Sequence, residues 1–184
     1  MNDDVYVSVG EFLGVLPYSS VAGMENVSTH MVGTQLIRLD PASTEVLAFC
    51  RNVRTADELG AWIDDQTGVT DAVIAHLVES GLLRHGPASQ AAVWLADRVL
   101  VPAGHSAGLV DGALCLLAPS GSAFRVDGVY YWLWLYARSG STLDSVRAFL
   151  DEQGQVEGTD DAATSAAVMH MLIHGLARID APGP

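Results

Sequence analysis

The sequence predicts an α+β protein in which one small unit, an antiparallel β-sheet followed by three short helices, occurs twice in tandem. Residues 37–67 align with residues 124–154 at a constant offset of 87, without a gap. After a seven-residue insertion in the second copy, residues 70–84 align with residues 164–178 at an offset of 94. Self-similarity of this kind is typical of a repeated structural unit. With 49% hydrophobic residues, each copy can bury a small core.

The repeat predicts two domains, a first over residues 1–87 and a second over residues 88–184. Units of this size lie near the lower limit for independent folding, so we expect the two to pack tightly on each other.

The strands of each copy are predicted by β-forming residues and by alternation. In the first copy, residues 5–16 mix β-formers with glycine and residues 32–39 tend to alternate, with a polar stretch between them. In the second copy, residues 93–101 and 112–126 supply strands, with a Pro-Ser-Gly turn inside the latter. We therefore expect a sheet of two or three strands at the start of each unit.

Capping signals place the helices. In the first copy Asp40 precedes Pro41, a typical helix start, and Thr55 with Glu58 forms a capping-box pattern for the second helix. Thr70 opens a third apolar helix that Gly81 ends. The second copy repeats this plan, with helices expected over residues 128–138, 142–153 and 162–174.

Charge limits the classes of partner. The chain has 22 acidic residues and nine basic ones, all arginine, for a net charge of −13. This charge repels nucleic acid and anionic membranes and leaves basic or apolar partners open, although it also serves solubility alone. The start of the chain does not have the pattern of a signal peptide, and the longest apolar run is too short to span a membrane. We expect a soluble, cytoplasmic protein.

A sheet followed by three helices is the organisation of a winged helix-turn-helix, whose third helix commonly reads DNA. In this chain, residues 70–80 and 164–174 contain no Arg, Lys, Asn or Gln to contact base edges, and Asp71 and Glu79 would face phosphates. Direct DNA binding is therefore disfavoured, and an extended peptide added to a sheet edge beside the apolar third helix becomes the leading hypothesis.

Three short motifs strengthen this hypothesis. Leu39-Asp40 leads into the first helix, residues 55–59 read T-x-x-E-L, and residues 77–83 read L-x-x-x-G-L-L, with weaker matches at 126–127, 142–146 and 171–177. In these motifs and in the order of its elements, the chain resembles the PqqD-like family, the RiPP recognition elements that hold the leader peptides of ribosomally made, modified peptides. Members of that family typically contain one copy of the unit, which is often fused to an enzyme.

The resemblance implies that a peptide lies between the third strand and the third helix of a unit. It implies the following peptide-binding residues, or their alternates along the strands: Thr34, Leu36, Arg38, Val73, His76, Leu77 and Ser80 in the first copy, and Leu114, Leu116, Ala167, His170, Met171 and His174 in the second. The implied partners are a precursor peptide and its modifying enzymes.

The histidines and cysteines do not form a recognisable catalytic site. His170 and His174 have the i, i+4 spacing of a metal pair, but no third ligand is evident, and no nucleophile motif or phosphate-binding loop is present. We expect no enzymatic activity, no metal and no cofactor.

One predicted helix of the second copy is apolar on all sides, which is typical of a helix buried all round. We expect its aromatic residues to form an interface between the two units or between two chains of a homodimer: Tyr130, Tyr131, Trp132, Trp134 and Tyr136. Two other functions stay open, a winged-helix transcriptional regulator and a tandem winged-helix structural adaptor of a larger complex.

Overall fold

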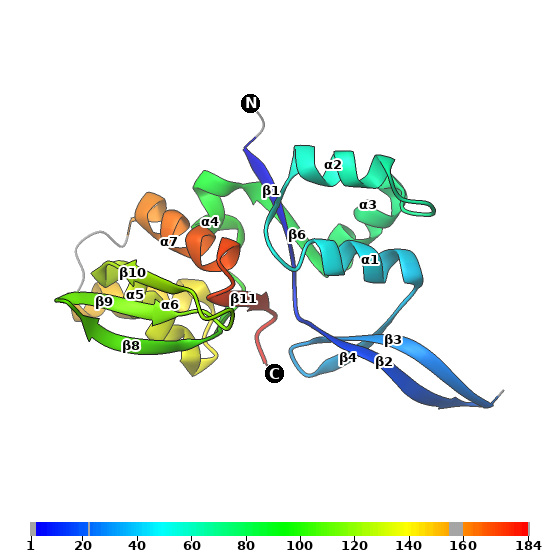
Figure 1. The fold of residues 1–184 in the computed structure, drawn as a ribbon, viewed down its shortest axis with the longest axis horizontal. Coiled ribbons are helices and arrows are strands. Elements are labelled where there is room, and N and C mark those ends of the chain that lie inside the picture. The colour runs from blue at the N-terminus through cyan, green and yellow to red at the C-terminus, as the bar shows by residue number, and fades with distance from the viewer. Residues whose placement is uncertain (1–2, 22, 155–159, 184) are drawn as a thin grey trace.

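The computed structural model describes residues 3–21, 23–154 and 160–183. Within them the chain is a mixed α+β protein with seven α-helices and several small antiparallel sheets. Below, residues up to 87 are called the first half and residues from 88 the second half. Figure 1 shows the halves side by side, with strand β1 running between them.

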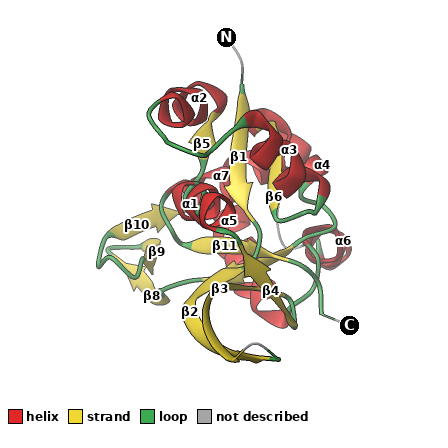
Figure 2. Cartoon of the chain, turned by 90° about the vertical axis from the view of Figure 1, so that its right-hand side faces the viewer, coloured by secondary structure: helices red, strands yellow, loops and turns green. Residues whose placement is uncertain are grey.

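The first half contains two small antiparallel sheets. β1 (Asp4–Ser8) pairs with the short β5 (Arg54–Thr55) on one side and with β6 (Leu83–Pro87) on the other. A second antiparallel sheet has the order β2-β3-β4, and its hairpin projects away from the body in both views (Figures 1 and 2). Its strands are β2 (Glu11–Ser20), β3 (Gly23–Val32) and β4 (Gln35–Leu39).

The helices of the first half start where the sequence predicts. Asp40 caps α1 (Pro41–Phe49) by accepting a hydrogen bond from the Ser43 N–H, and Thr55 and Glu58 form both bonds of the capping box at α2 (Ala56–Asp64). The third helix is α3 (Asp71–Glu79).

The second half has the same order of elements. The 3₁₀ turn Ala88–Gln90 and α4 (Ala91–Trp94) lead into it, and β7 pairs with the last strand, β11. A sheet of order β10-β9-β8 precedes its three helices. The elements are β7 (Val99–Pro102), β8 (His105–Val110), β9 (Ala113–Leu117), β10 (Ala123–Val126), α5 (Gly128–Tyr136), the 3₁₀ turn Ala137–Ser139, α6 (Leu143–Gln153), α7 (Asp161–Ile173) and β11 (Ala177–Asp180).

Backbone contacts of the two halves correspond in detail. The Val9 N–H donates to the Leu82 carbonyl (2.9 Å), and 94 residues later the Ala103 N–H donates to the Leu176 carbonyl (2.8 Å). β2 and β8, the first strands of the β2-β3-β4 and β10-β9-β8 sheets, also have a β-bulge at the corresponding place. The bulge lies between Phe12 and Gly14 in β2 and between Ser106 and Gly108 in β8. The repeat therefore extends into the strands before residue 37, where the sequence alignment did not detect it.

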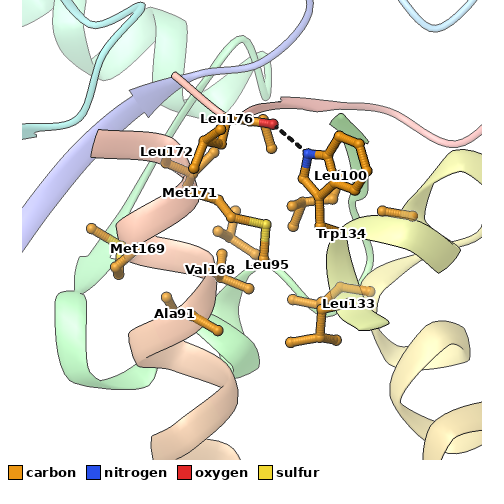
Figure 3. Close-up of a cluster of buried hydrophobic side chains, with 14 of the residues drawn as sticks. Ala91, Leu95, Leu100, Leu133, Trp134, Val168, Met169, Met171, Leu172 and Leu176 are labelled. Carbon is orange, nitrogen blue, oxygen red and sulfur yellow. Dashed lines mark hydrogen bonds between the residues drawn. The ribbon is translucent and has the colours of Figure 1, made fainter. Parts of the chain in front are cut away.

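Two clusters of buried side chains form the core, and β1 contributes to both. One cluster lies within the first half, where α1, α2 and α3 pack around Leu77. The other lies in the second half around Trp134 (Figure 3), yet it includes Val5, Val7 and Val9 of the β1 segment. Tyr6, whose side chain points to the opposite side of the strand, packs against the first cluster.

The C-terminal strand completes this junction. The Gly10 N–H donates to the Ile179 carbonyl (2.7 Å), and the carboxylate of Asp180 accepts a hydrogen bond from the Gly33 N–H (2.7 Å). The two halves are therefore joined by β1 and β11 as well as by the chain itself.

Three details of the predicted elements were wrong. Residues 91–94 form α4, because the apolar run in which the strand was predicted starts as a helix that packs against α7. The polar stretch at residues 18–29 was expected to separate strands, but most of its described residues belong to β2 and β3. β8 was not predicted, since its Ser, Ala and Gly residues have little β-propensity.

Candidate functional site

In the sheet formed by β2, β3 and β4, the outer edge of β4 is the one at which another strand could pair. In the sheet of order β2-β3-β4, the outer strands are β2 and β4. The edge of β2 is interrupted by its bulge and by Pro17, which has no N–H to donate. β4 pairs with β3 in unbroken register and contains no proline. Only the β4 edge of this sheet therefore offers an uninterrupted ladder.

The hairpin between β3 and β4 decides which groups of β4 face outward. Val32 pairs with Gln35 across a two-residue turn, and such flanking residues exchange hydrogen bonds with each other. Because hydrogen-bonded and non-bonded pairs alternate along an antiparallel ladder, Leu36 and Arg38 direct their main-chain N–H and C=O groups away from β3. Both residues are among the predicted peptide-binding positions.

The side chains of β4 divide between two faces. Leu36, which is 65% exposed, and Arg38 point away from the body, and the Arg38 guanidinium lies 3.3 Å from the centroid of the Tyr18 ring. The alternates Ile37 and Leu39 belong to the cluster that contains Leu77 of α3. Thr34 lies in the exposed turn that precedes β4.

The predicted residues of α3 also separate by exposure. Leu77 is only 1% exposed and is a core residue, and Val73 is half-buried against the same cluster. His76 and Ser80 are exposed, and the Ser80 hydroxyl donates to the Leu77 carbonyl (3.1 Å). The side chains that α3 exposes at His76 and Ser80 are therefore polar.

In the second half, three of the six predicted residues lie in the core. Leu116, Ala167 and Met171 are buried, whereas Leu114 is half-buried. The remaining two, His170 and His174, belong to a ring cluster that is described next.

The ring cluster consists of Phe124, Tyr130, His170 and His174. The Tyr130 hydroxyl lies 2.6 Å from Nδ1 of His170, and the rings of His170 and His174 are 4.2 Å apart. Phe124 of β10 packs against both histidines, at centroid distances of 5.8 Å and 4.6 Å. These rings fill the space between the third strand of the sheet and the third helix.

Burial controls protonation in this cluster. Desolvation, followed by the charge of His174, lowers the pKa of His170, and desolvation followed by the charge of Asp127 raises the pKa of Tyr130. Burial therefore favours the neutral form of His170, whose ring is bonded to the Tyr130 hydroxyl. Among the described residues no third metal-ligating side chain joins His170 and His174.

The first half has smaller side chains at three of the four corresponding positions. By the offsets of the repeat, Phe124, Tyr130 and His174 correspond to Ile37, Ser43 and Ser80, and His170 corresponds to His76. Sequence reasoning named the two histidines as peptide contacts and Tyr130 as an interface residue, but missed Phe124. The substitution of the aliphatic Ile37 by a ring in the alignment was the signal that could have found it.

The aromatic helix α5 packs within the second half. The Trp134 indole, 1% exposed, donates its Nε1–H to the Leu176 carbonyl at 3.0 Å (Figure 3). Tyr130 is buried, and Tyr131, Trp132 and Tyr136 are half-buried against the same cluster. Trp132 stacks on Tyr136 at a centroid distance of 5.7 Å. These side chains thus support the second core and the ring cluster.

None of the described helices is both long and apolar enough to cross a membrane. No family model, no curated protein and no solved structure matches the chain significantly.

Proposed function

We propose that the chain is a non-catalytic peptide-binding protein that holds an extended segment of a precursor peptide by strand addition at β4 and presents it to separate modifying enzymes. The observation that carries this proposal is the uninterrupted edge of β4 beside a β2 edge that is blocked by a bulge and by Pro17. Strand addition supplies affinity through main-chain hydrogen bonds, and the neighbouring side chains supply specificity.

The first half is the peptide-binding copy in this proposal. In the second half, Phe124, Tyr130, His170 and His174 occupy the space between β10 and α7. The first half has the smaller side chains Ile37, Ser43 and Ser80 at the positions of three of these rings, and Ser80 is exposed beside His76. The second half then acts as the structural support of the first.

The order of elements in each half, a three-stranded sheet followed by three helices, supports two tandem winged-helix units of the PqqD-like type. The acidic charge and the absence of Arg and Lys from α3 and α7 favour a peptide over nucleic acid. On this proposal the protein works in the cytoplasm.

A structural adaptor is the second candidate, and one observation favours it. The projecting β2–β3 hairpin exposes Val15 (60%) and Met24 (70%), and residues 12–24 contain no charged side chain. An exposed apolar arm of this kind is typical of a protein-protein contact.

Capture from an extract of the native host tests the proposal. The tagged protein is incubated with nuclease-treated extract, and bound material is identified by mass spectrometry down to short peptides. We expect a small precursor peptide, lost with Leu36→Pro, which removes an outward N–H of β4, and retained with Leu36→Val, which keeps it. Circular dichroism of both variants verifies the fold.

Other outcomes replace the proposal. Recovery of a large protein alone would support the adaptor, and material recovered only without nuclease would support a transcriptional regulator. Equal peptide capture by Leu36→Pro and Leu36→Val would exclude β4 as the binding edge.

A further inference from the structure

A cleft of about 540 Å³ lies between the two halves, apart from the β4 edge. The first half contributes the β1–β2 corner, His30 of β3 and the end of α1, and the second half contributes the turn before β10, the end of α7 and part of β11. This volume lies within the range of small-molecule sites, which often form between packed units of a protein.

The polar lining of the cleft carries a local positive charge in an acidic protein. Arg178 pairs with Glu11 across the two halves (2.9 Å), so these charges compensate each other. Arg51, exposed at the end of α1, forms no ion pair with any described residue. One uncompensated guanidinium, within a chain of net charge −13, favours a ligand with a single negative charge over a polyanion.

His30 forms part of the wall of the cleft. It lines the cleft, is 2% exposed, and its Nε2 lies 2.7 Å from the Val9 carbonyl. Because a carbonyl oxygen only accepts, Nε2 carries a proton and donates to it. The other ring nitrogen, Nδ1, is also buried and has no hydrogen-bond partner among the described residues, so a ligand in the cleft does not reach it.

Apolar side chains complete the lining. Phe12 and Ile173, one from each half, are 42% and 53% exposed and border the cleft together with Leu47. A ligand that covers them gains from burial of apolar surface.

We propose that this cleft binds a compact carboxylate with an apolar body. Arg51 would hold the carboxylate, and Phe12 with Ile173 would contact the apolar body. Both an N-acylated amino acid and the C-terminal residue of a peptide have this chemistry. The site is independent of β4, so either proposal can fail without the other.

Titration of the full chain, monitored by ¹H–¹⁵N NMR, tests the proposal. The probes are N-acetyl-leucine, its uncharged amide, and a pentapeptide that ends in leucine as the free acid or as the amide. We expect both acids to shift the amide signals of His30, Asn52 and Gly175, and Arg51→Gln to weaken binding about tenfold or more. Arg125→Gln, an exposed arginine outside the cleft, is the matched control and should bind as the original chain does.

The results also distinguish the two sources of the carboxylate. Binding of N-acetyl-leucine supports a small acid as ligand, whereas binding of the peptide acid alone supports a peptide C-terminus. Equal binding of acids and amides, no binding at about 10 mM, or no effect of Arg51→Gln would overturn the proposal.

Discussion

Two glycines determine the corners at which the chain enters the β2-β3-β4 sheet and the β10-β9-β8 sheet. Gly10 and Gly104 have φ angles of +92° and +76°, which L-residues with side chains rarely adopt. A Cβ at Gly10 would overlap the carbonyl oxygen of Met31, and one at Gly104 would overlap that of Leu117. Each corner therefore requires glycine for two separate reasons, backbone conformation and close approach.

Gly10→Ala should lower the free energy of unfolding by about 2 kcal/mol or more, because the alanine is strained and its Cβ displaces the β3 backbone. Gly60→Ala is the control. Gly60 lies inside α2 with open space around it, so alanine there should stabilise by about 0.5–1 kcal/mol. Urea unfolding followed by circular dichroism measures both changes, and similar effects of the two would contradict the role of the corner.

At the scale of secondary-structure elements, the contact of α5 with α7 depends on a neutral histidine. His170 of α7 meets Tyr130 of α5, and burial lowers the pKa of the histidine below its ordinary value of 6.5. As pH falls below that value, the unfolded chain takes up a proton that the folded chain resists. The contribution of His170 is therefore complete above the unfolded pKa and decreases as the solution becomes more acidic.

His170→Gln should flatten the loss of stability between pH 7 and pH 5, since glutamine does not titrate. His105→Gln, at an exposed position of β8, is the control and should leave the pH dependence as it is. The measurement is the free energy of unfolding in urea at four or five pH values. A slope that His170→Gln leaves unchanged would show that other groups control it.

The elements that could be predicted from sequence are those with local causes. The Asp40 and Thr55 caps were confirmed because a cap depends on residues three positions apart. The helix at residues 91–94 was missed, since its packing partner α7 lies far away in sequence. β8 was missed although its partner β9 follows directly, because its Ser, Ala and Gly residues have little β-propensity. For the candidate site, β4 and the two histidine positions were named from the sequence, but the exposure of each side chain depends on packing. Leu77 and Met171, proposed as contacts, are core residues for this reason.

At the scale of the whole molecule, the two cores are linked through one strand. Alternate side chains of the β1 segment face opposite cores, with Val5, Val7 and Val9 on one side and Tyr6 on the other. A strand that belongs to both cores cannot leave one without disturbing the other. The two halves are therefore expected to unfold together.

Differential scanning calorimetry should show one transition, with a calorimetric enthalpy equal to the van't Hoff enthalpy. Val7→Ala, at a residue that is 2% exposed, should cost about 2 kcal/mol and lower the single midpoint without splitting it. Two resolved transitions, of which Val7→Ala shifts only one, would show that the halves unfold independently.

The bridge between Val9 and Ile179 joins segments near opposite ends of the chain. During synthesis the β1 segment leaves the ribosome long before its partner in β11, which follows much later in the sequence. Until then Val5, Val7 and Val9 have no second core to enter, and contacts of such long range close slowly. Newly made chains should therefore depend on a chaperone that covers this valine-rich segment, and release from it should coincide with completion of the second core.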